Sequence, residues 1–352
     1  MKPWSSHARR YIAAFAVVLL ALPAIATGEL PDRLEPLFGR GGGSSPTVVT
    51  ESVVFTPAGW PVPLAGDLYL PASASESSRL TPVVLVLHGG AWRQGDKSSV
   101  TDLGRALADR GYAAFAINYR FAPQSPYPAQ LRDMQESVRW LQAHAGEHRL
   151  DMDRFALWGY SSGGYLAVLL AVQPASDLPP VRAVVAGGAP TDLRAAEAAD
   201  AESVREFLGG TRAELPALYD QASPITHVRS GLPPFFLYHG RADTQVPPAQ
   251  SENLARALRS AGVPVELVLL EGLDHEGAAT AAGLRPQALN FLDRYLSSGG
   301  EGLPGYLPER MPGQLPAPLP QDVPPEMPVP TLPEESEGED MLDRLRQGVP
   351  SR

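Results

Sequence analysis

The chain has 352 residues, of which 44% are hydrophobic and 19% charged, and its formal net charge is −10. This composition suits a globular enzyme with a sizeable core, whereas the acidic balance argues against nucleic-acid binding, which depends on neutralising phosphates. The chain contains no cysteine, so thiolate catalysis, disulfides and cysteine-ligated metals are excluded.

Residues 1–26 have the layout of a secretory signal peptide. A basic segment that ends in Arg9 and Arg10 precedes the apolar run Tyr11–Leu22, and small residues follow before Thr27. A signal peptidase cuts after such small residues, and the apolar run is shorter than a membrane span needs. We therefore expect an exported protein, periplasmic or secreted, without a stable membrane span after cleavage. An uncleaved membrane anchor is the alternative.

Strand and helix patterns alternate through the middle of the chain. Residues 27–46 form a short segment rich in glycine and serine, which is typical of a flexible connection. After it, strands are expected at 48–55, 68–70, 83–87, 113–118, 155–158, 181–186, 235–238 and 265–270. Helices are expected at 103–110, 129–144, 163–173, 250–261 and 286–296.

This alternation predicts an α/β fold over residues 47–297, with a mostly parallel sheet covered by helices on both faces. The first two strands are expected to form an antiparallel N-terminal edge. Residues 298–352 differ in character, because they are rich in proline and acidic residues and have almost no aromatic ones. Such a segment buries too little apolar surface to offset its ordering entropy, so we expect a disordered tail. A wall-associated or partner-docking tail is the alternative.

Residues 159–163 (GYSSG) fit the pattern G-x-S-x-G between an expected strand and an expected helix. In a sharp strand-to-helix turn, glycines on both sides of the serine avoid clashes between backbones, and the hydroxyl projects at the carboxyl edge of the sheet. The context therefore predicts Ser161 as a nucleophile rather than part of an ordinary Gly/Ser turn.

A serine nucleophile needs a base and an acid that orients the base. His275 follows the strand 265–270 and is expected at the same sheet edge as Ser161, which makes it the expected base. Asp243 follows the strand 235–238 and is the expected acid; Asp192 and Asp274 are its rivals. The chain order serine, aspartate, histidine is the one expected for the α/β-hydrolase fold.

The glycine pair after strand 83–87 is expected to stabilise the negative charge of a tetrahedral intermediate. Backbone donors are predicted from Gly90 and Ala91, with the N–H of Ser162 completing the site and Gly89 as an alternative. His88 is expected to support this loop through hydrogen bonds rather than to act as a catalyst.

These motifs together resemble the α/β-hydrolase esterases of the hormone-sensitive-lipase and bacterial feruloyl-esterase-like groups. The resemblance covers roughly Thr47–Leu296 and includes the segments 67–71 (DLYLP), 118–123 (NYRFAP) and 239–247 (HGRADTQVP). It implies a serine hydrolase but does not name the substrate. Hormone-sensitive lipases typically carry a helical cap built partly from a longer N-terminal segment. Here only residues 27–45 are available for a cap, and many of them are glycine and serine, so the site is expected to be more open. Residues 193–222 are the candidate for a small lid.

The expected reaction is hydrolysis of a small-molecule carboxylic ester through an acyl-enzyme, without a metal or an organic cofactor. Trp92 and Tyr160 are candidates to line the substrate pocket, with simple packing as the alternative. The same predicted catalytic residues could instead belong to an amidase or peptidase-type hydrolase, or to an aryl formamidase. A non-catalytic binding protein with this fold is a further alternative.

Overall fold

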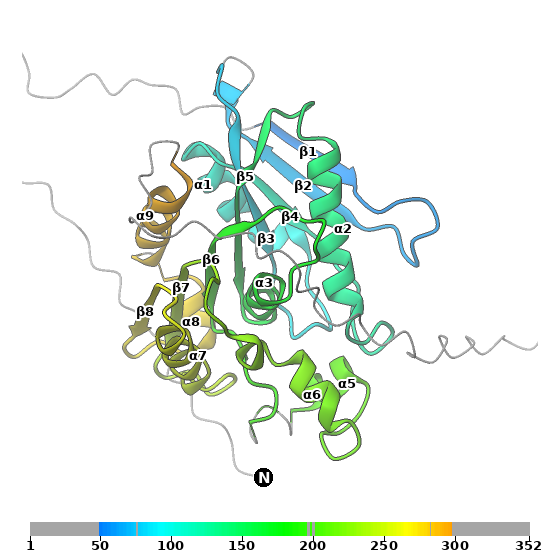
Figure 1. Cartoon of the computed structure of the whole chain (residues 1–352), viewed down its shortest axis with the longest axis vertical. Helices are drawn as coiled ribbons and strands as arrows, with labels where there is room; N and C mark the ends of the chain where they lie inside the picture. Colours follow the sequence, from blue (N-terminus) through cyan, green and yellow to red (C-terminus); the bar gives the residue numbers. More distant parts are fainter. Residues whose placement is uncertain (1–48, 75–76, 196–197, 199–200, 282, 298–352) are drawn as a thin grey trace, which may run out of the picture. The chain divides into compact units, whose positions relative to one another are not determined.

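The computed structural model describes residues 49–74, 77–195, 198, 201–281 and 283–297 (Figure 1). The predicted signal peptide, the segment 27–46 and the predicted tail 298–352 lie outside the described residues. All described elements belong to a compact unit that begins at Val48.

Among the described residues, eight strands form one sheet in the order β1-β2-β4-β3-β5-β6-β7-β8. The pairs β1–β2 and β2–β4 are antiparallel, and all other neighbours are parallel. This arrangement confirms the predicted α/β fold with an antiparallel N-terminal edge. The strands are β1 (Val49–Val54), β2 (Ala65–Leu70), β3 (Thr81–Leu87), β4 (Ala113–Ile117), β5 (Leu150–Tyr160), β6 (Val181–Gly187), β7 (Phe235–Gly240) and β8 (Val265–Leu270).

Helices cover both faces of the sheet (Figure 1). They are α1 (Thr101–Asp109), α2 (Ala129–Ala143), α3 (Ser162–Val172), α5 (Glu202–Leu208), α6 (Pro216–Ala222), α7 (Ala249–Ser260), α8 (His275–Ala279) and α9 (Leu284–Leu296). Short 3-10 helices lie at Ala72–Ala74, Lys97–Val100 and Pro224–His227. Each expected helix is present with ends shifted by a few residues, and α5, α6 and α8 are additional.

The core consists of two apolar layers, one on each face of the sheet. Val83 and Leu85 of β3 contribute to the layer that contains α2 and α3, whereas Val84 and Val86 contribute to the layer that contains α1 and α9. This alternation follows from the two-residue period of a strand, and it explains why β3 is apolar throughout.

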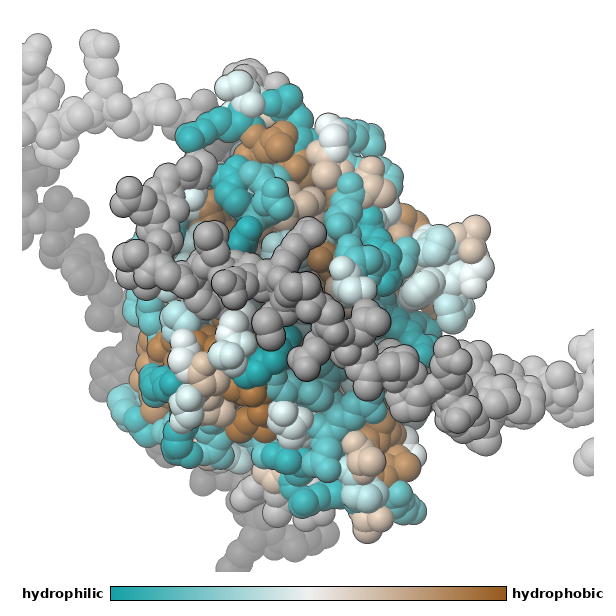
Figure 2. All heavy atoms as spheres, viewed as in Figure 1, coloured by the Kyte–Doolittle hydropathy of each residue, from teal (hydrophilic) through white to brown (hydrophobic). Residues whose placement is uncertain are grey.

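Helix α3 is buried along its whole length. A helix surrounded by protein on all sides needs apolar residues on all sides, which accounts for the sequence of α3 after its first glycines. On the face shown in Figure 2, hydrophilic and hydrophobic residues are interspersed. In the described part of the chain, the exposed large hydrophobic side chains are Val54, Val62 and Leu80.

Candidate active site

Ser161 lies in the sharp turn between β5 and α3, as the sequence pattern predicts. Its backbone has φ 55° and ψ −125°, an unfavourable conformation for a residue with a Cβ. The Ser161 N–H donates a hydrogen bond to the carbonyl of Gly187 at 2.8 Å, which ties the turn to the end of β6. The hydroxyl is thereby held at the carboxyl edge of the parallel strands.

The glycines around Ser161 are required by close backbone contacts. A Cβ on Gly159 would lie 2.2 Å from the carbonyl oxygen of Gly163, and a Cβ on Gly163 would lie 2.2 Å from that of Leu87. Both distances are far below van der Waals contact, so a larger residue at either position would push α3 away from the sheet. The two glycines of the motif therefore have a steric origin.

The three residues predicted as nucleophile, base and acid lie in one hydrogen-bonded chain. The Nε2 of His275 is 2.9 Å from the Oγ of Ser161, and the Nδ1 of His275 is 2.6 Å from the Oδ2 of Asp243. His275 and Asp243 are both 5% exposed. With Asp243 accepting from Nδ1–H, the Nε2 of His275 is free to accept the Ser161 proton.

Backbone contacts between two loops bring the acid to the base. The N–H of Ala242 donates to the carbonyl of Leu273 at 2.9 Å, so the loop after β7 lies beside the loop after β8. A Cβ on Gly240 would lie 2.4 Å from the same Leu273 oxygen, which explains the glycine at the end of β7. This close approach places Asp243 under His275.

The two rival aspartates have other partners. Asp192 forms an ion pair with Arg194 at 2.8 Å. Asp274 caps the N-terminus of α8 by accepting a hydrogen bond from the N–H of Gly277 at 2.8 Å. Neither of these two contacts involves His275.

A second histidine, His239, contacts the acid and was not among the predicted site residues. Its Nε2 lies 3.1 Å from the Oδ2 of Asp243, and its Nδ1 lies 2.7 Å from the Oγ of Ser251 in α7. His239 is fully buried. The signal available in the sequence is the pair His239 and Asp243, four residues apart at the end of one strand.

The loop after β3 lies against the nucleophile. A Cβ on Gly89 would lie 3.3 Å from the Cβ of Ser161, so the loop and the turn are in close contact. Ala91 and Trp92 both have left-handed backbones, with φ 55° and 59°. Ser162, the third expected donor, is the first residue of α3. The loop that carries the expected donors Gly90 and Ala91 thus contacts the Ser161 turn through Gly89, and Ser162 directly follows Ser161.

His88 supports this loop, as expected. Its Nδ1 lies 2.7 Å from the carbonyl oxygen of Gly89, and its ring stacks on Tyr119 with centroids 4.4 Å apart. Burial lowers the pKa of the His88 imidazole, so the ring is neutral at neutral pH and Nδ1–H is the donor to Gly89.

The structure places Trp92 in the core rather than on the wall of an open pocket. Its side chain stacks on Phe207 of α5 with centroids 4.4 Å apart and meets Tyr165 edge-on, and Trp92 is 2% exposed. Of the two possibilities for Trp92, packing is the one observed. Residues 193–222, the candidate lid, include α5 and α6 (Figure 1). Phe207 of α5 belongs to the hydrophobic core.

Tyr160 is half-buried beside the base. Its ring centroid is 5.1 Å from that of His275, and its hydroxyl donates a hydrogen bond to the His275 backbone carbonyl at 2.5 Å. Burial raises the pKa of the Tyr160 phenol, so the hydroxyl keeps its proton and remains a donor.

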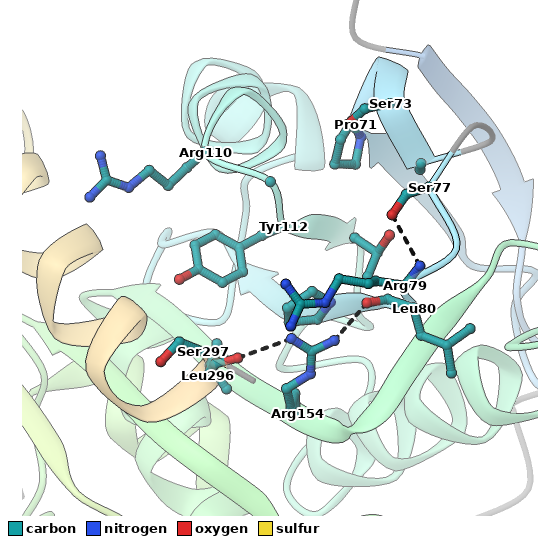
Figure 3. A pocket seen from close by; sticks show the side chains of 14 residues that line it. Pro71, Ser73, Ser77, Arg79, Leu80, Arg110, Tyr112, Arg154, Leu296 and Ser297 are labelled. Carbon is teal, nitrogen blue, oxygen red and sulfur yellow. Dashed lines mark hydrogen bonds between the residues drawn. The ribbon is translucent and has the colours of Figure 1, made fainter. Parts of the chain in front are cut away.

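A cavity of about 270 Å³, shown in Figure 3, lies at the end of the sheet opposite to Ser161. It is near the start of β3 and the ends of α1 and α9, and none of Ser161, Asp243 and His275 lines it. At its edge, Arg154 donates to the carbonyls of Leu80 at 2.6 Å and Leu296 at 3.3 Å. These bonds join α9 to the start of β3, so Arg154 has a structural role here.

The described residues contain no group of three or more histidine, aspartate or glutamate side chains that could hold a metal ion. In the same part of the chain, none of the helices combines the length and the apolar character that crossing a membrane requires.

Comparison with known proteins shows that this chain is similar to esterases. A family model described as BD-FAE matches residues 66–258, more than half of the 352-residue chain. Esterase LipQ of Mycobacterium tuberculosis is 32% identical over 201 residues, which cover 52% of this chain and 47% of LipQ. Esterase LipI of the same organism is 29% identical over 282 residues, which cover 70% of this chain and 80% of LipI.

Solved structures agree with these relatives. The esterase Est2 of Thermogutta terrifontis in its propionate-bound form is 28% identical, with a TM-score of 0.58 over 70% of this chain and 93% of Est2. The chain spans about half the length of curated relatives such as LipQ. Together these similarities confirm the resemblance to α/β-hydrolase esterases inferred from the motifs.

Proposed function

Because the chain belongs to the BD-FAE family, we propose that it hydrolyses carboxylic esters through an acyl-enzyme on Ser161. The observation that carries this proposal is the 2.9 Å contact between Ser161 Oγ and His275 Nε2, with Asp243 on the other side of the imidazole. Relatives named as esterases support the same reaction class.

The proposed reaction has two halves. In the first, the Oγ of Ser161 attacks the ester carbonyl carbon while His275 takes its proton. The bond from the carbonyl carbon to the alcohol oxygen then breaks, and His275 returns the proton to the departing alcohol. In the second, a water molecule loses a proton to His275 and its oxygen attacks the acyl carbon. The bond from that carbon to the Oγ of Ser161 then breaks, and His275 returns the proton to Oγ, which releases the carboxylic acid and restores the Ser161 hydroxyl.

Each half passes through a tetrahedral intermediate with a negatively charged oxygen. The backbone N–H groups of Gly90, Ala91 and Ser162 are the proposed donors to this oxygen, with Gly89 as the alternative. Support comes from the contact between the loop after β3 and Ser161, and from the position of Ser162 at the N-terminus of α3, where backbone N–H groups lack partners within the helix.

A fluorophosphonate probe tests the proposal, because it reacts with activated serines. Wild-type protein is expected to be labelled and to hydrolyse p-nitrophenyl acetate, and Ser161→Ala is expected to lose both. Ser137→Ala is the matched control, since Ser137 is a buried serine in α2 that donates only to the Met134 carbonyl in the same helix at 2.7 Å. Folded wild-type protein that resists the probe would refute the proposal and favour a binding protein.

A panel of substrates separates the proposed esterase from the alternative hydrolases. The panel contains p-nitrophenyl esters of increasing acyl length, feruloyl and acetyl-xylan esters, aryl formamides and aryl amides. Preference for esters by kcat/KM is expected. Faster hydrolysis of the amides or formamides would replace the esterase proposal with the amidase or formamidase one.

We also propose that the protein is exported and cleaved near Ala26. The support is the order of a basic segment, the apolar run Tyr11–Leu22 and small residues. Expression of the full chain in a bacterial host, followed by fractionation and N-terminal sequencing, tests this. A chain that keeps its first 26 residues in the cytoplasm would contradict it.

A further inference from the structure

The acid Asp243 accepts four hydrogen bonds in the structure. Its Oδ1 accepts from the backbone N–H groups of Gln245 at 2.9 Å and Val246 at 2.8 Å. Its Oδ2 accepts from His275 at 2.6 Å and from His239 at 3.1 Å. Four donors occupy the lone-pair sites of a carboxylate, so its orientation is fully determined.

The contacts of His239 specify which of its nitrogens carries the proton. Its Nε2 faces two acceptors, the Oδ2 of Asp243 at 3.1 Å and the carbonyl oxygen of Val246 at 2.8 Å, so Nε2 must be the N–H donor. Its Nδ1 lies 2.7 Å from the Oγ of Ser251, a hydroxyl that is able to donate. Burial lowers the pKa of His239, which favours this neutral form.

We infer that His239 is a positioning residue, held by Ser251, that fixes the carboxylate of Asp243 toward His275. This inference rests on the proposed function, because it assigns His239 a role in the same reaction. The chain of contacts then runs from Ser251 in α7 through His239, Asp243 and His275 to Ser161. All of the first four residues are at most 5% exposed, so no water competes readily for these hydrogen bonds.

The N–H of His239 also affects how strongly the carboxylate of Asp243 attracts a positive charge. A donor to Oδ2 spreads the negative charge of Asp243 and weakens its attraction for the protonated form of His275. Removal of that donor should therefore strengthen this attraction and move the acid limb of the activity profile to higher pH. It should also let the carboxylate turn away, and misplacement of a catalytic group by about 1 Å costs up to ~10²-fold in rate.

The test compares His239→Phe, which removes the donor, with His239→Gln, whose side-chain amide reaches the position of Nε2 and retains it. The readout is the pH profile of kcat/KM for p-nitrophenyl acetate, per active site titrated with a fluorophosphonate. His239→Phe is expected to lower kcat by about tenfold or more and to move the acid limb to higher pH. His239→Gln is expected to keep the acid limb near its wild-type position, with KM similar in all three proteins.

Other ionisable groups near the two histidines stay the same in all of these proteins, so a moved limb reports on position 239. They are Asp243 itself, Tyr160, whose ring centroid is 5.1 Å from that of His275, and Asp274 and Glu276, the sequence neighbours of His275.

The outcomes separate this inference from the proposed function. If the wild-type enzyme is active and His239→Phe has the same kcat and the same acid limb, the inference alone is overturned. An equal displacement of the acid limb in His239→Gln and His239→Phe would also overturn it, because the donor would then be irrelevant. Wild-type protein without esterase activity would instead overturn the proposed function.

A measurement on the wild-type protein covers the case in which His239→Phe does not fold. Nitrogen-15 NMR of labelled histidine is expected to show His239 as the neutral Nε2–H form at pH 7 and above, because burial lowers its pKa from 6.5. Its N–H resonance is expected to shift with the midpoint of the acid limb, because His239 and His275 share one carboxylate oxygen. A His239 resonance that is unchanged through this midpoint, or an Nδ1–H form, would overturn the inference.

Discussion

The hydroxyl of Tyr160 donates a hydrogen bond of 2.5 Å to the backbone carbonyl of His275, 115 residues further along the chain. Tyr160 directly precedes Ser161, so this bond links the turn that carries the nucleophile to the start of the helix that carries the base. It fixes the His275 backbone relative to Ser161, whereas Asp243 fixes the imidazole. Tyr160, expected as a pocket residue, therefore also has a structural connection to the base.

Tyr160→Phe is expected to lower kcat per titrated site by about fivefold, the rate equivalent of roughly 1 kcal/mol, which is a typical net value of one hydrogen bond. Tyr165→Phe is the matched control, because its hydroxyl also donates to a backbone carbonyl, that of Ala222 at 2.7 Å. Both variants should lose similar stability in urea, but only Tyr160→Phe should lose rate. Equal rates in the two variants would contradict this role for Tyr160.

Phe207→Ala is expected to destabilise the protein by about 3–5 kcal/mol and also to lower kcat. The reason for the second effect is that Phe207 stacks on Trp92, which follows the left-handed residue Ala91 in the loop beside Ser161. Loss of this support should let the strained loop relax. Phe291→Ala removes an equally buried ring on the other face of the sheet and serves as control. Urea denaturation and kcat per titrated site are measured for both, and unchanged kcat in Phe207→Ala would disprove the proposed support.

Gly159→Ala is expected to destabilise the protein by about 3 kcal/mol or more, or to prevent folding, because its Cβ would lie 2.2 Å from the Gly163 oxygen. Gly146→Ala is the control, since a Cβ at that exposed position meets no atom within 4 Å. Its unfolding free energy should change by less than about 1 kcal/mol. Chemical denaturation followed by circular dichroism measures both, and a stable, active Gly159→Ala enzyme would be inconsistent with the observed turn.

Stability is expected to fall as the pH is lowered from 7 to 5. Burial lowers the pKa values of His88 and His239 from their ordinary 6.5, so the unfolded chain binds more protons in this range than the folded chain does. The unfolding free energy therefore rises with pH, with a slope of up to ~1.4 kcal/mol per pH unit for each group. Urea titrations of wild type and His88→Asn should show a smaller slope in the variant, whatever its absolute stability.

Asp177→Asn is the contrast for this pH series. The hydrogen bond from Arg139 lowers the pKa of Asp177 from its ordinary 3.8, so any stability that it contributes is lost only as the pH falls below about 4. The slope of its unfolding free energy between pH 7 and 5 should equal that of wild type. If the unfolding free energy of His88→Asn had the same slope against pH as that of wild type, His88 would not contribute to the pH dependence of stability.

The architecture and the position of the nucleophile were predictable because they depend on short-range patterns. The two-residue period of strands such as β3 and the regular alternation with helices indicate a parallel sheet wherever they occur. The glycine at 159 reflects a steric demand within five residues, whereas Gly163 is required by the carbonyl of Leu87 in the neighbouring strand β3. The short helices α5, α6 and α8 were not expected, since five to seven residues carry little periodicity.

The sequence by itself determined the fold class, the strand-to-helix turn of Ser161 and the set of residues able to serve as base and acid. Only the tertiary structure brought Asp243 rather than Asp192 or Asp274 to the imidazole, buried Trp92 under Phe207 and placed His239 on the acid. Which of several chemically equivalent side chains meet depends on loop contacts between residues about 30 to 115 positions apart, such as Ala242 with Leu273 and Tyr160 with His275. Such contacts form through the packing of the whole sheet, and no local pattern of residues encodes them.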